Sequence, residues 1–192
     1  RTMREIYLPA FETAVKKSQP YTVMCSYNKI NGTYASDNPW LLTKVLRDEW
    51  GFEGYVMSDW GAVNDRVSSL AAGLDLEMPP GDYENDRLIV KAVQEGTLDE
   101  AVLDRAVERI LNIVFEYVDN RKEQPLTLEE DHEFAQHVAE ESIVLLKNEE
   151  KVLPLEKNEK VAFIGGFVKN PRYQGGGSSH VNSFKVTSVW DA

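Results

Sequence analysis

The 192-residue sequence predicts an α/β protein in which a parallel sheet precedes a series of helices and the start of a second α/β unit. Three observations support this fold class. Short apolar runs alternate with amphipathic stretches, as in successive β-loop-α units. Two longer helical stretches follow, and another apolar run begins near the end of the chain. Right-handed crossovers would bring the carboxyl ends of the strands to one edge of the sheet.

The elements of the first half follow from apolar spacing and from breaker residues. The Gln19-Pro20 step ends a helical pattern that includes Pro9, and Asn31-Gly32 is typical of a loop. Asp37 or Asn38 can cap a helix that has proline in its first turn. The predicted elements are a helix at 2–17, a strand at 22–26, a loop at 28–36, a helix at 40–50, a strand at 55–58, a helix at 64–72, a strand at 73–78, a loop at 79–81 and a helix at 86–94.

The second half is predicted to be helical before it returns to a strand. Helical periodicity covers 99–117 and 128–146, polar connectors cover 119–125 and 147–160, and an apolar strand is expected at 161–166. We therefore expect three domains: a barrel-like part over 1–118, a helical connector over 119–159 and the beginning of a second α/β unit over 160–192.

Composition excludes several classes of function. The net charge of −11 argues against nucleic acid or an anionic membrane surface as a partner, and no apolar run reaches the length of a membrane span. A single cysteine, Cys25, excludes an internal disulfide and is expected in the core. The sequence favours a cytoplasmic location and leaves secretion open, because the natural N-terminus is expected to lie upstream of Arg1.

Candidate chemical groups follow the predicted strands. Tyr27 follows the first strand, Asp59 and Trp60 follow the second, and Asp75 and Glu77 lie on the third. A carboxylate beside an indole suits sugar binding, because the acid meets hydroxyls or the anomeric carbon while the indole stacks on ring C–H groups. Purely structural roles remain as alternatives: Asp59 could cap a helix, Trp60 could belong to the core, and the Tyr27 hydroxyl could bond to a loop.

Long motifs then carry a family resemblance. The runs MCSYNKINGTYASDNPWLLTKVLRDEWGFEGYVMSDWGAV and AAGLDLEMP resemble glycoside hydrolase family 3, and REIYLPAFETAVK, ESIVLLKNEEKVLPL and GGGSSHV resemble its β-glucosidase branch. The resemblance implies the second half of a (β/α)8-type barrel, a helical connector and the start of an α/β sandwich domain. It implies a β-glucoside or oligosaccharide as substrate, retaining hydrolysis and no cofactor; the oligomeric state stays open.

The resemblance also implies roles for particular residues. Asp59 matches the family's nucleophile, with Tyr27 beside it, Trp60 against the sugar and Met24 in the pocket wall. A second-domain loop would approach the same site with Ser178, Ser179 and His180. The tyrosine hydroxyl can orient the carboxylate and help to keep it ionised.

Part of the family's equipment is not found in this sequence. The sugar-binding aspartate, arginine and Lys-His pair are expected before Arg1, and the acid/base glutamate beyond Ala192. The connector carboxylates are interpreted as an exposed helix face; they are Glu129, Glu130, Glu133, Glu140 and Glu141. The chain by itself is therefore expected to be inactive.

Other functions remain as alternatives. MCSYN is compatible with a β-xylosidase or another β-glycosidase of the family, whereas its N-acetylglucosaminidase branch commonly lacks the second domain begun here. A non-catalytic fragment is the alternative from a different class. The GGGSSH loop lacks the lysine of a phosphate-binding loop, and the three histidines lack ligand spacing, so neither a nucleotide nor a metal is expected.

Overall fold

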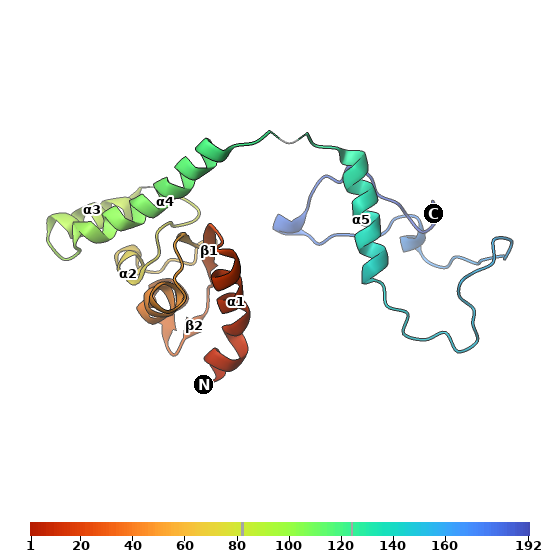
Figure 1. Cartoon of the computed structure of the whole chain (residues 1–192), viewed down its shortest axis with the longest axis horizontal. Helices are drawn as coiled ribbons and strands as arrows, with labels where there is room; N and C mark the ends of the chain where they lie inside the picture. The colour runs from red at the N-terminus through yellow and green to blue at the C-terminus, as the bar shows by residue number, and fades with distance from the viewer. Residues whose placement is uncertain (82, 124) are drawn as a thin grey trace. The chain divides into compact units, whose positions relative to one another are not determined.

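The structure is a computed structural model that describes residues 1–81, 83–123 and 125–192. Residue 124, inside the polar connector predicted at 119–125, lies outside the described residues. Two compact units make up the chain, Arg1–Lys122 and Glu123–Ala192 (Figure 1). Within the described residues, no helix combines the length and the apolar character needed to cross a bilayer.

A parallel pair of strands forms the centre of the first unit. Strands β1, Thr22–Cys25, and β4, Tyr55–Ser58, pair in register over four residues. Both strands were predicted, and β1 is one residue shorter than expected. The pair can approach so closely because Gly54 has no side chain: a Cβ there would lie 2.1 Å from the Tyr21 carbonyl oxygen.

The first predicted helix is divided in two. Helix η1 covers Met3–Tyr7 and has π-type hydrogen bonds, and helix α1 covers Pro9–Ser18. A single helix over 2–17 was therefore wrong, because Pro9 lacks an N–H and takes the first position of a new helix.

The predicted loop at 28–36 contains a small hairpin. Strands β2, Lys29–Ile30, and β3, Thr33–Tyr34, pair in antiparallel fashion around Asn31-Gly32, where both residues have positive φ. This is the turn chemistry that an Asn-Gly pair favours. A short 3₁₀ helix, η2, covers Ala35–Asp37.

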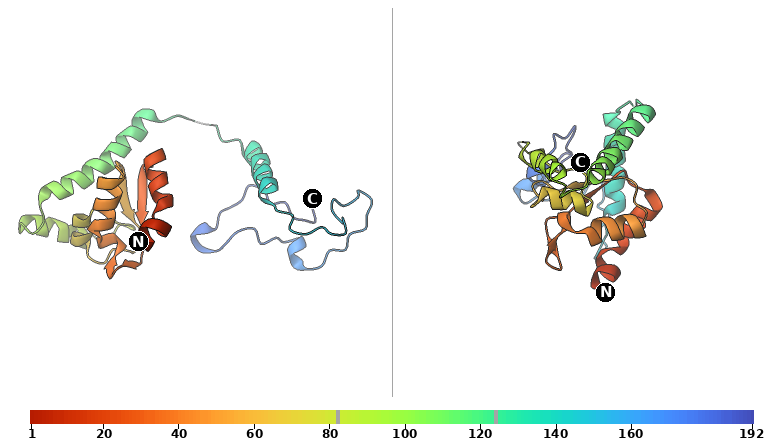
Figure 2. Two further views of the ribbon diagram at one scale, coloured as in Figure 1. Left: turned by 60° about the horizontal axis from the view of Figure 1, so that its bottom comes forward. Right: turned by 90° about the vertical axis from the view of Figure 1, so that its left-hand side faces the viewer.

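Helix η3, Trp40–Glu49, lies where the sequence predicted a helix. The Asn38 side chain accepts a hydrogen bond from the Leu41 N–H at 3.1 Å, which confirms the expected capping role. The strand pair lies between η3 and α1 (Figure 2), and their side chains form one apolar core with the strands. The buried members of this core are Leu8, Val15, Cys25, Ala35, Leu42, Val45, Leu46, Trp50, Phe52, Val56 and Leu74.

Cys25 belongs to this core, as predicted. Burial raises the pKa of its thiol, so the side chain behaves as a small apolar group. The cysteine contributes packing in the strand that leads to Tyr27.

Three further helices pack beside this core. Helix α2, Arg66–Ala72, begins after Asp65, whose carboxylate accepts from the Ser68 N–H at 2.8 Å. Helices α3, Glu84–Gln94, and α4, Glu100–Asn120, follow close to their predicted positions. They form a second apolar cluster with α2 through Leu70, Ile89, Ala92, Leu98 and Ala106.

The predicted third strand at 73–78 is reduced to one bridge, between Met57 and Leu76. Asp75 explains the difference. Its backbone N–H and that of Leu76 both donate to the Val56 carbonyl at 3.0 Å, while its carboxylate accepts from the Val56 N–H at 2.8 Å. A side chain that uses the neighbouring strand's N–H interrupts the regular ladder at that point.

Asp75 is also the centre of a buried ionic cluster. Its carboxylate is 1% exposed and lies 2.6 Å from the Arg47 guanidinium and 2.9 Å from that of Arg109. Burial lowers the pKa of Arg47 to about 10 although Asp75 opposes the shift, so Arg47 is still charged at neutral pH. One carboxylate thus connects η3, α4 and β4.

The second unit contains little regular structure. Helix α5 covers Leu128–Ser142, and the 3₁₀ turns η4 and η5 cover Gly166–Val168 and Gly177–Ser179. The five connector glutamates are exposed, as predicted. The helix predicted at 128–146 ends at Ser142, four residues earlier than expected.

The strand predicted at 161–166 was wrong for this structure. Ile164 is 92% exposed, and the described residues of this unit contain no strand that could pair with the segment. An apolar run of this length needs partner strands for its backbone groups. Local order comes instead from an edge-to-face contact between Phe163 and Trp190, with ring centroids 5.8 Å apart.

Replacing Asp75 tests the importance of the ionic cluster. In the full-length protein we expect Asp75→Asn to lower the free energy of unfolding by about 3–5 kcal/mol, because two partly buried arginines lose their buried counter-charge while Val56 keeps an acceptor. Denaturant unfolding measures the change. Asp48→Asn is the control, since Asp48 is exposed and lies 3.9 Å from Lys44, and should change it by less than about 0.5 kcal/mol. Equal small effects would contradict the interpretation.

Candidate active site

The candidate site is built where the strands end. Asp59 directly follows β4, and its N–H donates to the Cys25 carbonyl at the end of β1 at 3.3 Å. On the other side, the Ser58 N–H donates to the Leu76 carbonyl at 2.9 Å. The carboxyl ends of the three segments therefore meet, as the predicted parallel arrangement required.

Two contacts fix the turn that follows Asp59. One oxygen of its carboxylate accepts from the Trp60 N–H at 2.6 Å, and the Tyr27 hydroxyl donates to the Trp60 carbonyl at 2.8 Å. The nearby Asp59 carboxylate raises the pKa of Tyr27, and desolvation adds to the effect, while the hydroxyl proton itself is donated to the Trp60 carbonyl. Tyr27 thus stays a neutral donor.

These contacts test the purely structural roles considered for the three residues. Asp59 does not cap α2, because Asp65 does so, and Trp60 is not a core residue, because it is 63% exposed. Tyr27 does tie its hydroxyl to a backbone carbonyl, which was the simplest alternative for it. The effect of Asp59 on its pKa places the same tyrosine near the carboxylate, and its role beside a nucleophile stays a prediction.

Met24 lies on β1 and lines an apolar cavity of about 580 Å³ between the first two helices, β1 and η3. Among the described residues, the lining of this cavity includes Met24 but neither Tyr27 nor Asp59. The expected place of Met24 in the wall of the sugar pocket stays a prediction.

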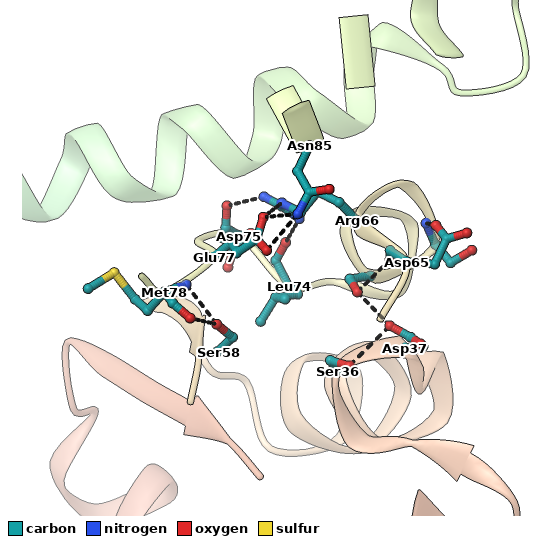
Figure 3. Close-up of polar contacts among 12 residues, drawn as sticks. Ser36, Asp37, Ser58, Asp65, Arg66, Leu74, Asp75, Glu77, Met78 and Asn85 are labelled. Atoms are coloured by element: carbon teal, nitrogen blue, oxygen red, sulfur yellow. Dashed lines mark hydrogen bonds and ion pairs between the residues drawn. The ribbon is translucent and has the colours of Figure 1, made fainter. Parts of the chain in front are cut away.

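Asp75 and Glu77, the other strand-end candidates, are occupied by structural partners. Asp75 holds two arginines, and Glu77 accepts from the Asn85 amide at 2.7 and 3.0 Å and lies 3.7 Å from the Arg66 guanidinium (Figure 3). Arg66 also donates to the carbonyls of Leu74 and Asp75. This cluster fixes the chain on both sides of the strand bridge and occupies the carboxylates of both Asp75 and Glu77.

The loop residues Ser178, Ser179 and His180 belong to the second unit and are exposed. The Ser179 hydroxyl donates to the Gly176 carbonyl at 2.9 Å, which closes the η5 turn. Their expected approach to the carboxylate stays a prediction. Among residues 1–81, 83–123 and 125–192, no group of three or more His, Cys, Asp or Glu side chains is arranged to hold a metal ion.

Sequence reasoning missed Ser58 and Met78. The Ser58 hydroxyl accepts from the Met78 N–H at 2.7 Å and donates to the Met78 carbonyl at 3.2 Å. A serine inside an otherwise apolar strand, one residue before the candidate nucleophile, was the available signal. Its partner could not be read from the sequence because the contact spans 20 residues.

A carboxylate and an exposed indole at the carboxyl ends of parallel strands define a site of the kind found in α/β barrel and open-sheet enzymes. The chain belongs to glycosyl hydrolase family 3. The model of the family's N terminal domain matches residues 1–113, and the model of its C-terminal domain matches residues 143–192.

Known relatives agree with this assignment. The chain is 54% identical over 192 residues to thermostable beta-glucosidase B of Acetivibrio thermocellus and 50% identical over 205 residues to an exo-alpha-(1->6)-L-arabinopyranosidase of Bifidobacterium breve. All of this chain is covered in both comparisons, but it spans only 25% and 26% of the length of those proteins.

Solved structures give the same result. The GH3 beta-glucosidase of Bifidobacterium adolescentis matches with a TM-score of 0.92 at 49% identity. Beta-glucosidase 3B of Thermotoga neapolitana, solved in complex with alpha-D-glucose, matches with a TM-score of 0.92 at 42% identity. Each match covers the whole of this chain and 28% of the other. The α/β class predicted from the sequence is thereby confirmed.

The state of Tyr27 can be tested by absorbance titration. We expect the difference between the full-length protein and its Tyr27→Phe variant to reveal one phenol that ionises above its ordinary pKa of 10.0. Because this pKa is raised on folding, the bonds of the neutral phenol stabilise the fold below pH 10 and are lost as the pH rises through the folded value. In an Asp59→Asn background the midpoint should fall toward the ordinary value. A midpoint below 10 in the parent protein would contradict the assignment.

Proposed function

We propose that the full-length protein carrying this chain is a retaining β-glycosidase that releases terminal β-D-glucosyl residues through a covalent glycosyl-enzyme on Asp59. The observation that carries the proposal is the Asp59-Trp60 turn. It combines an orientated carboxylate, a neutral tyrosine hydroxyl and an exposed indole at the carboxyl ends of parallel strands.

In that protein, residues 1–118 supply the C-terminal half of a (β/α)8-type barrel, 119–159 a connector and 160–192 the start of an α/β sandwich. Support for the barrel half comes from the parallel pairing of β1 with β4 and from the helices that follow each strand. The family membership supports the sandwich, for which the described residues of the second unit supply no strand pairing.

The proposed mechanism follows from the chemistry of the turn. The free oxygen of the ionised Asp59 attacks the anomeric carbon as the bond to the leaving oxygen breaks, and a second carboxylic acid, expected beyond Ala192, protonates that oxygen. The Trp60 N–H holds one oxygen of this carboxylate and leaves the other free to attack. The same second carboxylate then activates a water molecule, which releases the sugar from Asp59.

The neighbouring side chains would select the sugar. The exposed Trp60 indole offers an apolar platform for the ring C–H groups of glucose. Met24 is proposed for the pocket wall, and Ser178, Ser179 and His180 for a loop that approaches from the second domain. A neutral glycoside suits this acidic chain, whose net charge of −11 would repel anionic substrates.

A pentopyranoside is the second candidate substrate. Two arabinopyranosidases, from Bifidobacterium breve and Bifidobacterium longum, are each 50% identical to this chain over its whole length. Arabinopyranose and xylose both lack the hydroxymethyl group of glucose and differ from each other in the configuration at C4, so both alternatives require a site that does not depend on the hydroxymethyl group. The chain is 54% identical to a beta-glucosidase and 50% identical to these arabinopyranosidases, so sequence similarity does not separate the two substrates.

The nucleophile can be tested by trapping and by rescue. In the full-length protein, a slow 2-fluoro-glucoside should label the peptide around Ser58, Asp59 and Trp60. Asp59→Ala should lower kcat by roughly 10³-fold or more, because no covalent intermediate can form. Mass spectrometry locates the label, and an aryl-glucoside assay measures kcat.

Azide provides the control for this test. In Asp59→Ala it can enter the vacated space and attack the anomeric carbon as the aryl group leaves, so turnover of an activated aryl-β-glucoside should recover and yield an α-glucosyl azide. The parent protein should form no such product. A label on another residue, together with normal turnover in Asp59→Ala, would refute the assignment.

Substrate choice is measured by comparing kcat/KM for glucosides, xylosides and α-L-arabinopyranosides with one common leaving group. We expect the glucoside to be preferred by about 10-fold or more, since a binding pocket gains about 1–3 kcal/mol from each group that it fills. Trp60→Ala should weaken transition-state binding of all three, because they share the ring face. A clear preference for either pentoside would favour the second candidate.

A further inference from the structure

We infer that Ser58 is a positioning residue for the proposed nucleophile: two hydrogen bonds between its hydroxyl and the main chain of Met78 hold the Asp59-Trp60 turn in the position needed for attack. We call this pair of hydrogen bonds the clasp. This inference rests on the proposed function and adds to it a residue that never touches the sugar. Ser58 is 1% exposed and is the last residue of β4, directly before Asp59.

The clasp uses both main-chain groups of Met78. The Ser58 hydroxyl accepts from its N–H at 2.7 Å and donates to its carbonyl at 3.2 Å (Figure 3). The same carbonyl accepts from the Gly61 N–H at 2.9 Å. The Met78 peptide is thus bonded to the residue before the Asp59-Trp60 pair and to the residue after it.

The clasp completes a set of anchors on one short turn. The Asp59 N–H donates to the Cys25 carbonyl, and the Asp59 carbonyl accepts from the Ala62 N–H at 3.1 Å. The Trp60 carbonyl accepts from the Tyr27 hydroxyl. These anchors come from β1 and from the turn itself. Among the described residues, the turn is bonded to Met78, in the segment that follows the strand bridge, by the clasp and by the Gly61 N–H.

Ser58 acts through the backbone because side chains alternate along a strand. Its hydroxyl therefore points to the opposite face from the Asp59 carboxylate. Burial prevents bulk water from replacing the hydroxyl if it is removed, so the Met78 N–H must shift or stay unpaired, while the Met78 carbonyl keeps only its bond from Gly61. A displacement of about 1 Å at a reacting group can reduce the rate about 10²-fold.

The test separates attack from binding. Ser58→Ala in the full-length protein is treated with an activated 2-fluoro-glucoside, and the maximal inactivation rate is measured apart from the inhibition constant for reversible binding. We expect the maximal rate to fall about 10- to 100-fold while the inhibition constant changes by less than about threefold. A general loss of structure would not divide in this way.

Ser69→Ala is the matched control. Ser69 is 0% exposed in α2, and its hydroxyl shares its one proton between the Asp65 carbonyl, at 2.7 Å, and the Asp37 carboxylate, away from the turn. We expect this variant to lose thermal stability but to keep the inactivation rate. Both proteins are assayed well below their melting temperatures.

Ser58→Cys is a second variant that nearly keeps the side-chain volume while weakening both hydrogen bonds, and it should show a smaller fall in the same rate. An unchanged rate in a folded Ser58 variant would overturn the inference. An equal loss in Ser69→Ala would do so too, as would failure of both Ser58 variants to fold. A parent protein that carries its label on a residue other than Asp59 would instead refute the proposed function, so the two failures are distinguishable.

Discussion

The buried carboxylate of Asp75 is the constraint on which the first unit depends. It lies between two arginines from different helices and accepts the N–H of Val56, so a single side chain sets the distance between the helices and β4. Removing these charges from water is costly, as the lowered pKa of Arg47 indicates. The cluster is therefore better understood as a device for specifying position than as a source of net stability.

The site inherits its position from this constraint. Val56 lies three residues before Asp59, so a strand that is held at Val56 delivers its carboxyl end to a defined place. There the turn bonds to β1 through Cys25 and Tyr27 and to the following segment through Met78. Rigid supports of this kind are what an attacking group needs, since its rate depends on sub-ångström placement.

The features that the sequence could predict were those encoded locally. The strands at 22–25 and 55–58 and the helix at 40–49 have their own periodicity and breaker residues, and the Asn38 cap lies beside its helix. The third strand failed because Asp75 bonds to a partner 19 residues away. Family motifs identified Asp59 and Tyr27 as candidates, but no motif could indicate that Glu77 would be committed to Arg66 and Asn85.

The division of labour at Trp60 has a consequence for how such a protein can evolve. The bonds that fix this residue use its N–H and its carbonyl, whereas its indole projects into solvent. A substitution at Trp60 can therefore remodel the surface offered to a ligand and leave every bond of the turn in place. Ligand preference can then change within one lineage while the Asp59 carboxylate keeps its orientation, because the main-chain and side-chain atoms of Trp60 are subject to separate selective pressures.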